Sequence, residues 1–395
     1  MSALAPSPRT SYAEELAQIS AKLSAAPELS ALLHTAAFQI RQLLGCSVVV
    51  FTKPGSEATY VASANIGVPR EDLMHVRYEQ GDAFLKVLEQ AGVVRDGALP
   101  PNSSAVVPLR RHRELVGFMS LGRSPYTDDY TGPESDLLLA VADQLALHVE
   151  NFRVRDQDWE LSRVRELQER LLPSVASGIQ GYDVAHAWRP QRSVSGDYFD
   201  IIDLGENQLA VCIGDVIGKG MPAALLMSNV QAAVKAVASP DMSPSEVCSR
   251  VNRVLAGNLA AGNFVTFFYS IIDSRKGRLT YSNAGHVPPI LVRQNGSIQR
   301  LESGGALLGV FKSWAFEQGT IQLETGDRLV LFTDGISELK DAAEEEFGED
   351  RLERFVARNR TAPAAVLKDR ILAEIADFAN GAFQDDVTVV VVGAE

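Results

Sequence analysis

The sequence predicts an α+β protein made of two domains with a long helix between them. The 395 residues exceed the size to which a single hydrophobic core normally grows, which indicates two domains. Apolar residues with helical spacing continue from about residue 133 to Pro173, and no glycine or further proline interrupts them. Beyond that helix, short apolar strands arrive in adjacent pairs between helices. This pattern is typical of antiparallel sheets that are covered by helices.

The first part of the chain reads as a tail followed by a small mixed domain. Residues 1–26 comprise a tail of small residues and one short amphipathic helix. Residues 27–150 follow the order helix, strands, helix, strands, helix, with strands predicted over 46–51 and 116–121. The long helix then begins near Pro133, because proline is favoured in a first helical turn.

The long helix continues through a charged segment, residues 151–173, that keeps one apolar stripe. A stripe on an otherwise charged helix needs a partner. Two arrangements satisfy this requirement: the helix pairs with its copy in a homodimer, as in a coiled coil, or it lies along its own domain. The pattern alone leaves both open.

Residues 174–395 form the second domain, in which strands and helices alternate. Its main predicted elements cover residues 207–214, 223–237, 244–259, 264–273, 278–282, 290–293, 328–333, 364–379 and 387–392.

Composition excludes several classes of protein. A net charge of −13 argues against a nucleic-acid binder, which needs clustered lysine and arginine. The three cysteines lack CxxC spacing, so neither a disulfide framework nor a zinc site is expected. No signal peptide and no stretch of 18 apolar residues occurs, and we therefore expect a cytoplasmic protein without a membrane span.

Four aspartates of the second domain are each predicted beside a strand end: Asp197, Asp215, Asp334 and Asp385. A single aspartate next to glycine is usually only a turn residue. Carboxylates in apolar surroundings, however, are costly unless they are paired or bind a metal. Several that converge would suit hard divalent ions such as Mg²⁺ or Mn²⁺.

The glycine-rich turn that holds Asp215 deserves a separate interpretation. Its sequence fails the phosphate-binding spacing GxxxxGK[ST], because Gly220 follows Lys219. We therefore interpret it as a turn that presents Asp215 and the carbonyl group of Val216 at a strand end.

Six motifs in this order carry a family resemblance: SGDYFD, GDVIGKGMPAAL, FVTFFYSIID, SNAGHVPPIL, LFTDGISE and QDDVTVVVV. They resemble the metal-dependent serine/threonine phosphatases of the PPM (protein phosphatase 2C-like) family, and more narrowly its bacterial sporulation stage II and stress-response sigma-factor branch. The resemblance covers residues 174–395 and implies an α-β-β-α sandwich with two Mn²⁺ or Mg²⁺ ions at one edge of the paired sheets.

The same resemblance implies the site residues. Asp215 is expected to bridge both ions beside Asp197, and Asp334 and Asp385 are expected to complete the site, with the Val216 carbonyl as a further ligand. A water activated by the two ions would attack phosphorus in line, without a covalent enzyme intermediate.

Some positions depart from the family pattern or stay ambiguous. No histidine follows the bridging aspartate, so the general acid is unassigned. Arg192 is a loosely aligned candidate for a phosphate contact, and Asp386 is an alternative to Asp385 as ligand. His286 fits a family motif, but we favour a structural histidine that bonds a loop backbone. Asp200 is expected just outside the ligand shell.

Residues 27–150 resemble a GAF domain, a small-molecule sensor module, in their opening helix, their glycine-containing strand and their closing helix. Neither a cyclic-nucleotide signature nor a chromophore cysteine is expected, because Cys46 falls in a predicted strand. His34, His75 and His112 are isolated and are not expected to bind haem. The ligand is not identified.

Together these features predict a phosphatase that hydrolyses phosphoserine or phosphothreonine on a regulatory protein under control of the GAF-like domain. The resemblance suggests a STAS-type anti-sigma-factor antagonist as the substrate. Two rivals are a catalytically degenerate scaffold and a hydrolase of small phosphoesters. The complete aspartate set argues against the scaffold.

Overall fold

A computed structural model describes residues 12–54, 58–97, 99–112, 114–126, 130, 132–173, 179–259 and 262–395. The predicted N-terminal tail, 1–10, lies outside these ranges. Contacts divide the chain into two compact units, with the division between Trp159 and Glu160. No helix in the described ranges combines the length and the apolar character that a membrane span requires.

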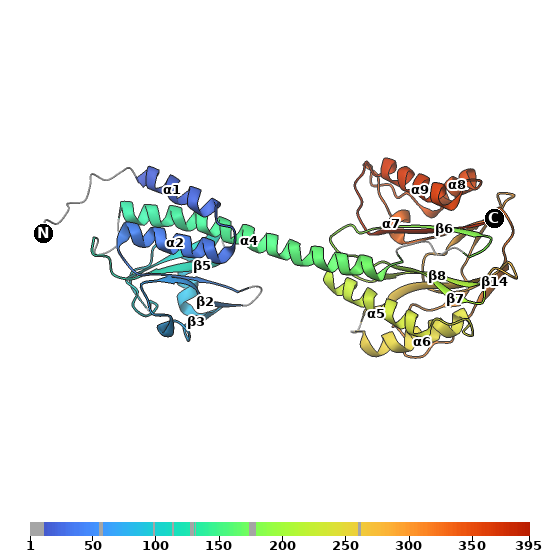
Figure 1. Cartoon of the computed structure of the whole chain (residues 1–395), viewed down its shortest axis with the longest axis horizontal. Coiled ribbons are helices and arrows are strands. Elements are labelled where there is room, and N and C mark those ends of the chain that lie inside the picture. Colours follow the sequence, from blue (N-terminus) through green and yellow to red (C-terminus); the bar gives the residue numbers. More distant parts are fainter. Residues whose placement is uncertain are drawn as a thin grey trace. The chain divides into compact units, whose positions relative to one another are not determined.

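The first unit is a five-stranded antiparallel sheet with helices on both faces (Figure 1). The sheet order is β3-β2-β1-β5-β4. Its strands are β1 (Val48–Thr52), β2 (Thr59–Ile66), β3 (Arg77–Glu79), β4 (Ala105–Arg111) and β5 (Glu114–Leu121). Its helices are α1 (Tyr12–Ser24), α2 (Leu29–Leu44), the 3₁₀ turn η1 (Arg70–Asp72), α3 (Ala83–Gln90) and the first part of α4 (Pro133–Leu171).

Two cores flank this sheet. On one face, apolar residues of α1, α2 and α4 pack together, and Cys46 is buried among them. On the other face, below α3, aromatic rings pack against one another, with Phe51 stacked on Phe118 at 4.6 Å between centroids.

The long helix α4 confirms the predicted uninterrupted helix, which ends at Leu171. Its stripe from Leu138 to Val149 is buried in the core of its own unit, as one of the two arrangements requires. Further along, Val154 and Leu167 are 51% and 60% exposed, so the stripe in the charged segment is not covered in the same way.

The second unit contains two antiparallel sheets that pack face to face between helices (Figure 1). The first sheet, in the order β13-β10-β9-β8-β7 with β14 beside β10, has its antiparallel strands in long registers and one short parallel pair. Its strands are β7 (Tyr198–Gly205), β8 (Gln208–Val216), β9 (Val265–Asp273), β10 (Arg278–Ala284), β13 (Gly304–Gly305) and β14 (Gly319–Gln322).

The second sheet has the order β12-β11-β15-β16-β6. Its strands are β6 (Tyr182–Arg189), β11 (Ile290–Val292), β12 (Ile298–Arg300), β15 (Arg328–Phe332) and β16 (Val387–Ala394). The helices of the unit are α5 (Met221–Val237), α6 (Pro244–Asn258), α7 (Asp334–Ser337), α8 (Glu349–Asn359) and α9 (Ala364–Phe378).

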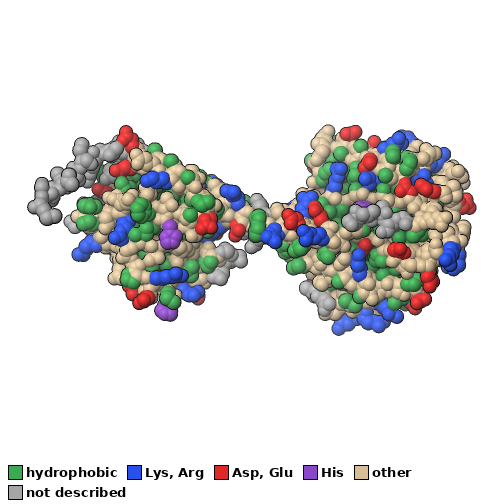
Figure 2. Space-filling model, in the orientation of Figure 1, with side chains coloured by type: hydrophobic (Ala, Val, Ile, Leu, Met, Phe, Trp, Pro, Cys, Tyr) green, Lys and Arg blue, Asp and Glu red, His purple; other side chains and the backbone are tan. Residues whose placement is uncertain are grey.

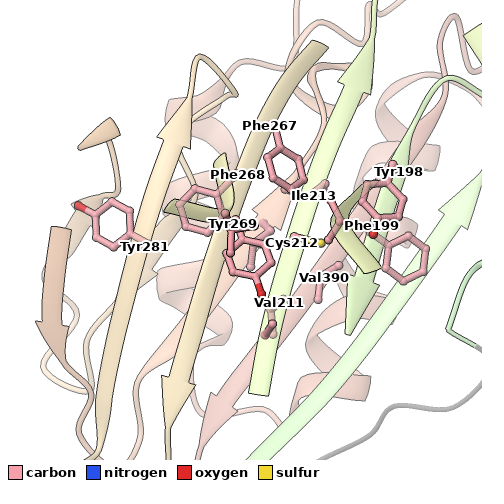
Figure 3. Packing of buried hydrophobic residues seen from close by; sticks show 14 of the residues in the cluster. Tyr198, Phe199, Val211, Cys212, Ile213, Phe267, Phe268, Tyr269, Tyr281 and Val390 are labelled. Atoms are coloured by element: carbon pink, nitrogen blue, oxygen red, sulfur yellow. The ribbon is translucent and has the colours of Figure 1, made fainter. Parts of the chain in front are cut away.

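Strand alternation builds the layers of this sandwich. In β16, Val390 and Val392 join the core shared with the first sheet, whereas Val389 and Val391 join the core beneath α8 and α9. Figure 3 shows the former core, in which rings of β7, β9 and β10 crowd around β8. The architecture is the expected α-β-β-α sandwich, and the paired strands predicted from the sequence lie in it as antiparallel neighbours.

Sequence reasoning missed seven elements of the second unit: β6, β7, β12, β13, β14, α7 and α8. β7 contains two aspartates, and β6 mixes polar with apolar residues, so neither shows a clear strand period. The surface of both units mixes acidic, basic and hydrophobic side chains over the face that Figure 2 shows.

Candidate metal centre

The predicted aspartates meet at one edge of the two sheets. Asp197 immediately precedes β7, and Asp215 is the penultimate residue of β8, whose Gly214 pairs with Tyr198. In the second sheet, Asp334 begins α7 directly after β15, and Asp385 lies two residues before β16. Adjacent antiparallel strands that end and begin at the same edge therefore bring all four positions together.

Asp197 is held by the opposite sheet. Its Oδ2 accepts hydrogen bonds from the hydroxyl groups of Thr333 at 2.9 Å and Thr388 at 2.5 Å. Its backbone N–H donates to Ser195 Oγ at 3.0 Å. Burial of this side chain, which is 2% exposed, raises the pKa of Asp197, and repulsion from Asp215 raises it further. The threonine donors act in the opposite direction.

Asp215 lies at the electrostatic centre of the group. Burial raises its pKa to about 7, and repulsion from Asp334, Asp385 and Asp386 contributes in that order. Burial also raises the pKa of Asp334, with further repulsion from Glu338 and Asp385. Such mutual repulsion is the expected consequence of concentrating carboxylates in one partly dehydrated place.

The adjacent residues Asp385 and Asp386 have different partners. Asp385 forms an ion pair with Lys219 of the glycine-rich turn, with Oδ2 2.9 Å from Nζ. Asp386 accepts hydrogen bonds from the backbone N–H groups of Gln191 at 2.7 Å and Gly196 at 3.1 Å. Asp386 therefore holds the loop in front of β7, whereas Asp385 lies beside a half-exposed lysine side chain.

Gly335 explains how α7 approaches this edge. A Cβ atom at this position would lie 1.9 Å from the backbone oxygen of Asp386, so no side chain fits. The DG pair after β15 thus reflects a close approach of two backbones at the site.

His286 proves to be a structural link. It is buried, its Nε2 lies 3.1 Å from the backbone oxygen of Phe332, and its Nδ1 lies 2.8 Å from Thr266 Oγ1. That hydroxyl group is 3.2 Å from the backbone nitrogen of Asp215. The histidine therefore supports the backbone on both sides of the carboxylate cluster, as the structural interpretation of this residue expects.

Two other candidates have surroundings different from those of the four aspartates. Asp200 is buried and forms an ion pair with Lys235 of α5 at 3.1 Å, while its carboxylate also accepts a hydrogen bond from Tyr198. It therefore anchors a helix rather than a ligand. Arg192 is exposed in the loop before β7.

The three histidines considered as haem ligands are all exposed. His34 lies on α2, His75 on the segment before β3 and His112 in the turn between β4 and β5.

The donor set suits a hard divalent cation, although its side chains are turned toward protein partners. In the described ranges, no three His, Cys, Asp or Glu side chains are placed as they stand to hold a metal ion. Two of the carboxylates already have protein partners. Oδ2 of Asp197 accepts hydrogen bonds from two threonines, and Asp385 forms an ion pair with Lys219. Buried carboxylate oxygens that repel one another nevertheless fit Mg²⁺ or Mn²⁺ chemically, because a cation would neutralise that repulsion.

Sequence reasoning missed the residues that orient the aspartates. Thr333 directly precedes Asp334, and Thr388 follows the Asp-Asp pair, so both stood inside motifs already singled out. Their role was hidden because each contacts an aspartate more than 130 residues away along the chain.

Comparison with known proteins agrees with this geometry. Residues 205–395 match the family model described as stage II sporulation protein E (SpoIIE), and residues 28–151 match a GAF domain model. The phosphoserine phosphatase RsbU of Bacillus subtilis (strain 168) is 30% identical over 235 residues, which cover 59% of this chain and 69% of RsbU.

Two further relatives bear on the fold and on the extent of the match. Protein IcfG of Synechocystis sp. is 30% identical over 59% of this chain but only 41% of its own length. The SiaA-PP2C domain of Pseudomonas aeruginosa matches 61% of this chain and 98% of that domain, with a TM-score of 0.55 and 19% identity. The resemblance stated from the motifs is thereby confirmed: the chain belongs to the SpoIIE-type branch of PP2C-like serine phosphatases and carries a GAF domain ahead of its phosphatase domain.

Proposed function

We propose that the chain is a metal-dependent protein phosphatase that hydrolyses phosphoserine or phosphothreonine on a regulatory protein. The observation that carries this proposal is the cluster of Asp197, Asp215, Asp334 and Asp385 at one edge of the sandwich, where burial and then mutual repulsion raise the pKa of Asp215 to about 7. A site that concentrates this much negative charge is built for cations.

The roles of the residues follow from their positions. Asp215 repels carboxylates of both sheets and would bridge two Mn²⁺ or Mg²⁺ ions. Asp197, Asp334, Asp385 and the Val216 carbonyl would be the further ligands. When bound, the ions would supply Lewis-acid activation of a water and would neutralise phosphate oxygens. Asp386 would hold the loop before β7 and leave coordination to Asp385.

Lys219 is placed to contact the substrate phosphate. Its ammonium group is about half exposed and lies against Asp385. If a metal ion neutralised Asp385, the Lys219 ammonium group would be free to pair with a phosphate oxygen. It would then orient the phosphoester without acting as a nucleophile.

We further propose that the substrate is a STAS-type anti-sigma-factor antagonist. The support is membership of the same family as RsbU, whose printed description is phosphoserine phosphatase. Residues 27–150 would act as the sensor, 151–173 as the connecting helix and 174–395 as the phosphatase domain.

The connecting helix offers a physical route for regulation. Gln168, near the end of α4, is 2% exposed, and its amide exchanges two hydrogen bonds with the backbone of Ser195, at 3.0 and 3.2 Å. Ser195 Oγ in turn accepts the N–H of Asp197. A shift or rotation of α4 would therefore reach a metal ligand through two contacts, and pairing of α4 in a homodimer would supply the shift.

The test is phosphate release from a phosphoserine protein and from p-nitrophenyl phosphate, with and without Mn²⁺. Full-length protein, residues 160–395 and Asp215→Asn forms of both are compared. The proposal requires Mn²⁺-dependent turnover that the substitution abolishes. Regulation by the GAF domain requires that the full chain and residues 160–395 release phosphate at different rates. Metal binding without turnover by either length would favour the scaffold.

A further inference from the structure

A loop beside the metal centre exposes two stacked aromatic rings. Phe311 and Trp314 are 48% and 43% exposed, and their rings stack at 5.1 Å between centroids. Val310 in the same loop is 48% exposed, and Ile217 of the glycine-rich turn is 40% exposed. We call Ile217, Val310, Phe311 and Trp314 the apolar rim. Large apolar side chains gathered at a surface are typical of interaction sites.

Backbone pairing places this rim beside the cluster. Leu308 forms a two-way bridge with Val265, through N–O distances of 2.9 and 3.0 Å, and Val265 in turn pairs with Val216 of β8. Two strand spacings, or roughly 10 Å, therefore separate the backbone of Leu308 from that of Val216. Ile217 hydrogen-bonds to Phe264 in the same region. The apolar rim therefore starts beside Val216, the residue that follows Asp215.

The loop is anchored, so the rings are presented rigidly. Asn252 of α6 is 2% exposed and uses both ends of its amide on the loop: Nδ2 donates to the oxygen of Phe311 at 2.9 Å, and Oδ1 accepts from the nitrogen of Gly309 at 2.8 Å. The backbone of Glu317 fixes the C-terminal end of the loop. Its N–H donates to the backbone oxygen of Gly304, and its carbonyl oxygen accepts a hydrogen bond from the Ser282 hydroxyl group.

Trp314 also lies against Gly305. A Cβ atom at that glycine would be 2.5 Å from the indole nitrogen, so the ring occupies the space a side chain would need. A buried asparagine and a glycine thus hold two rings that remain nearly half exposed. Aromatic residues held in place bind partners at little cost in conformational entropy, and tryptophan is over-represented among the residues that dominate binding energy.

We propose that the apolar rim is the docking surface for the folded part of the phosphoprotein substrate. This inference rests on the proposed phosphatase function. When a protein substrate brings its phosphoserine to the aspartate cluster, the surface around that phosphoserine must contact the region beside the cluster. The apolar rim lies in that region. The partner that this surface fits is the phosphorylated STAS-type protein, which would carry an apolar patch beside its phosphoserine. A small phosphoester does not reach the rim.

The test compares two substrates with the full chain in saturating Mn²⁺: a phosphorylated STAS-domain protein and p-nitrophenyl phosphate. Phe311→Ala and Trp314→Ala should each raise KM for the phosphoprotein roughly tenfold or more, the scale expected for a dominant interface residue. The same substitutions should shift kcat/KM for the small ester much less. Trp314→Phe should recover much of the loss, because it keeps a ring.

Val366→Ala is the matched control, since Val366 is 40% exposed on α9 and lies outside the rim. Equal losses on both substrates would overturn the docking role, as would unchanged phosphoprotein kinetics. A changed sedimentation coefficient with unchanged phosphoprotein KM would also overturn it and assign the rim to contact between copies of the chain. If wild-type protein hydrolyses neither substrate, the phosphatase proposal fails. If it hydrolyses only the small ester, the docking proposal alone fails.

Discussion

His286 joins the two sheets of the phosphatase domain through the backbone oxygen of Phe332, which lies 3.1 Å from its Nε2. Because a carbonyl oxygen only accepts, Nε2 carries the proton, and Nδ1 accepts from the hydroxyl group of Thr266. Thr266 Oγ1 is then free to accept the N–H of Asp215. A neutral histidine thus connects the ends of β8 and β15, the strands that lead to Asp215 and Asp334.

This link predicts a specific loss of stability in acid. Burial lowers the pKa of His286 from 6.5 to about 4. The pKa of His286 is lower in the folded protein than in the unfolded chain. The contribution of the neutral histidine to stability is therefore complete above pH 6.5 and is lost as the pH falls through about 4. The shift in pKa corresponds to roughly 3 kcal/mol of unfolding free energy. His286→Gln should be less stable than wild type at pH 7, by an amount that shrinks between pH 6.5 and 4.

Urea unfolding at several pH values measures this difference. Two of the three tryptophans, Trp188 and Trp314, lie in the phosphatase domain, so in a Trp159→Phe background tryptophan fluorescence reports on that domain. Parallel pH dependences for wild type and His286→Gln would contradict the account.

The threonine donors to Asp197 give a second prediction. Thr388→Val removes the 2.5 Å hydrogen bond to Oδ2, one of the two threonine contacts that fix the orientation of this carboxylate. The half-saturating Mn²⁺ concentration should rise roughly 10–100-fold, the usual effect of removing a partner of a ligand. Thr388→Ser keeps the hydroxyl group and should stay near wild type. Activity titrated against Mn²⁺ decides, and equal curves for Thr388→Val and Thr388→Ser would rule this role out.

Lys219 predicts an effect of opposite sign. Its ammonium group competes with a metal for Asp385. Lys219→Gln should therefore lower the half-saturating Mn²⁺ concentration severalfold, while KM for the phosphoester rises because a phosphate contact is lost. Lys276→Gln is the control, since Lys276 forms a similar ion pair with Asp273 far along β9. Weaker Mn²⁺ binding in Lys219→Gln would show that the lysine does not compete.

The ion pair between buried Asp200 and exposed Lys235 predicts an asymmetry between single and double variants. Asp200 is 1% exposed, so Lys235→Met leaves a buried carboxylate without its counter-charge and should reduce the free energy of unfolding by about 1–3 kcal/mol. Replacing both, as in Asp200→Asn with Lys235→Met, should recover a substantial part. Chemical denaturation of the three proteins tests this. Additive losses in the double variant would mean that the pair is not coupled.

Much of the fold was predictable because its strongest elements have clear periods. β8, β9, β15 and β16 are nearly continuous apolar runs bounded by glycine or aspartate, and α4 lacks any helix breaker. β7 escaped prediction because it places Asp200 inside a core, where its carboxylate pairs with Lys235 on a helix 35 residues later and accepts a hydrogen bond from Tyr198.

The aspartates of the candidate site were predictable from the sequence, but the residues that support them were not. A strand end is visible in sequence, so the aspartates were found. The packing of the two sheets determines which hydroxyl groups contact Asp197. The local sequence pattern cannot predict that packing. The apolar rim was equally hidden, because Phe311 and Trp314 resemble ordinary core residues until their exposure is known.

The most direct test of the central claim counts Mn²⁺ ions bound to the full chain, by calorimetry with parallel phosphate-release assays. If Asp215 bridges two ions, wild-type protein binds two per chain, and Asp215→Asn binds at most one and releases no phosphate in response to Mn²⁺. Retention of two ions and full turnover by Asp215→Asn would contradict the assignment of this cluster as the catalytic centre.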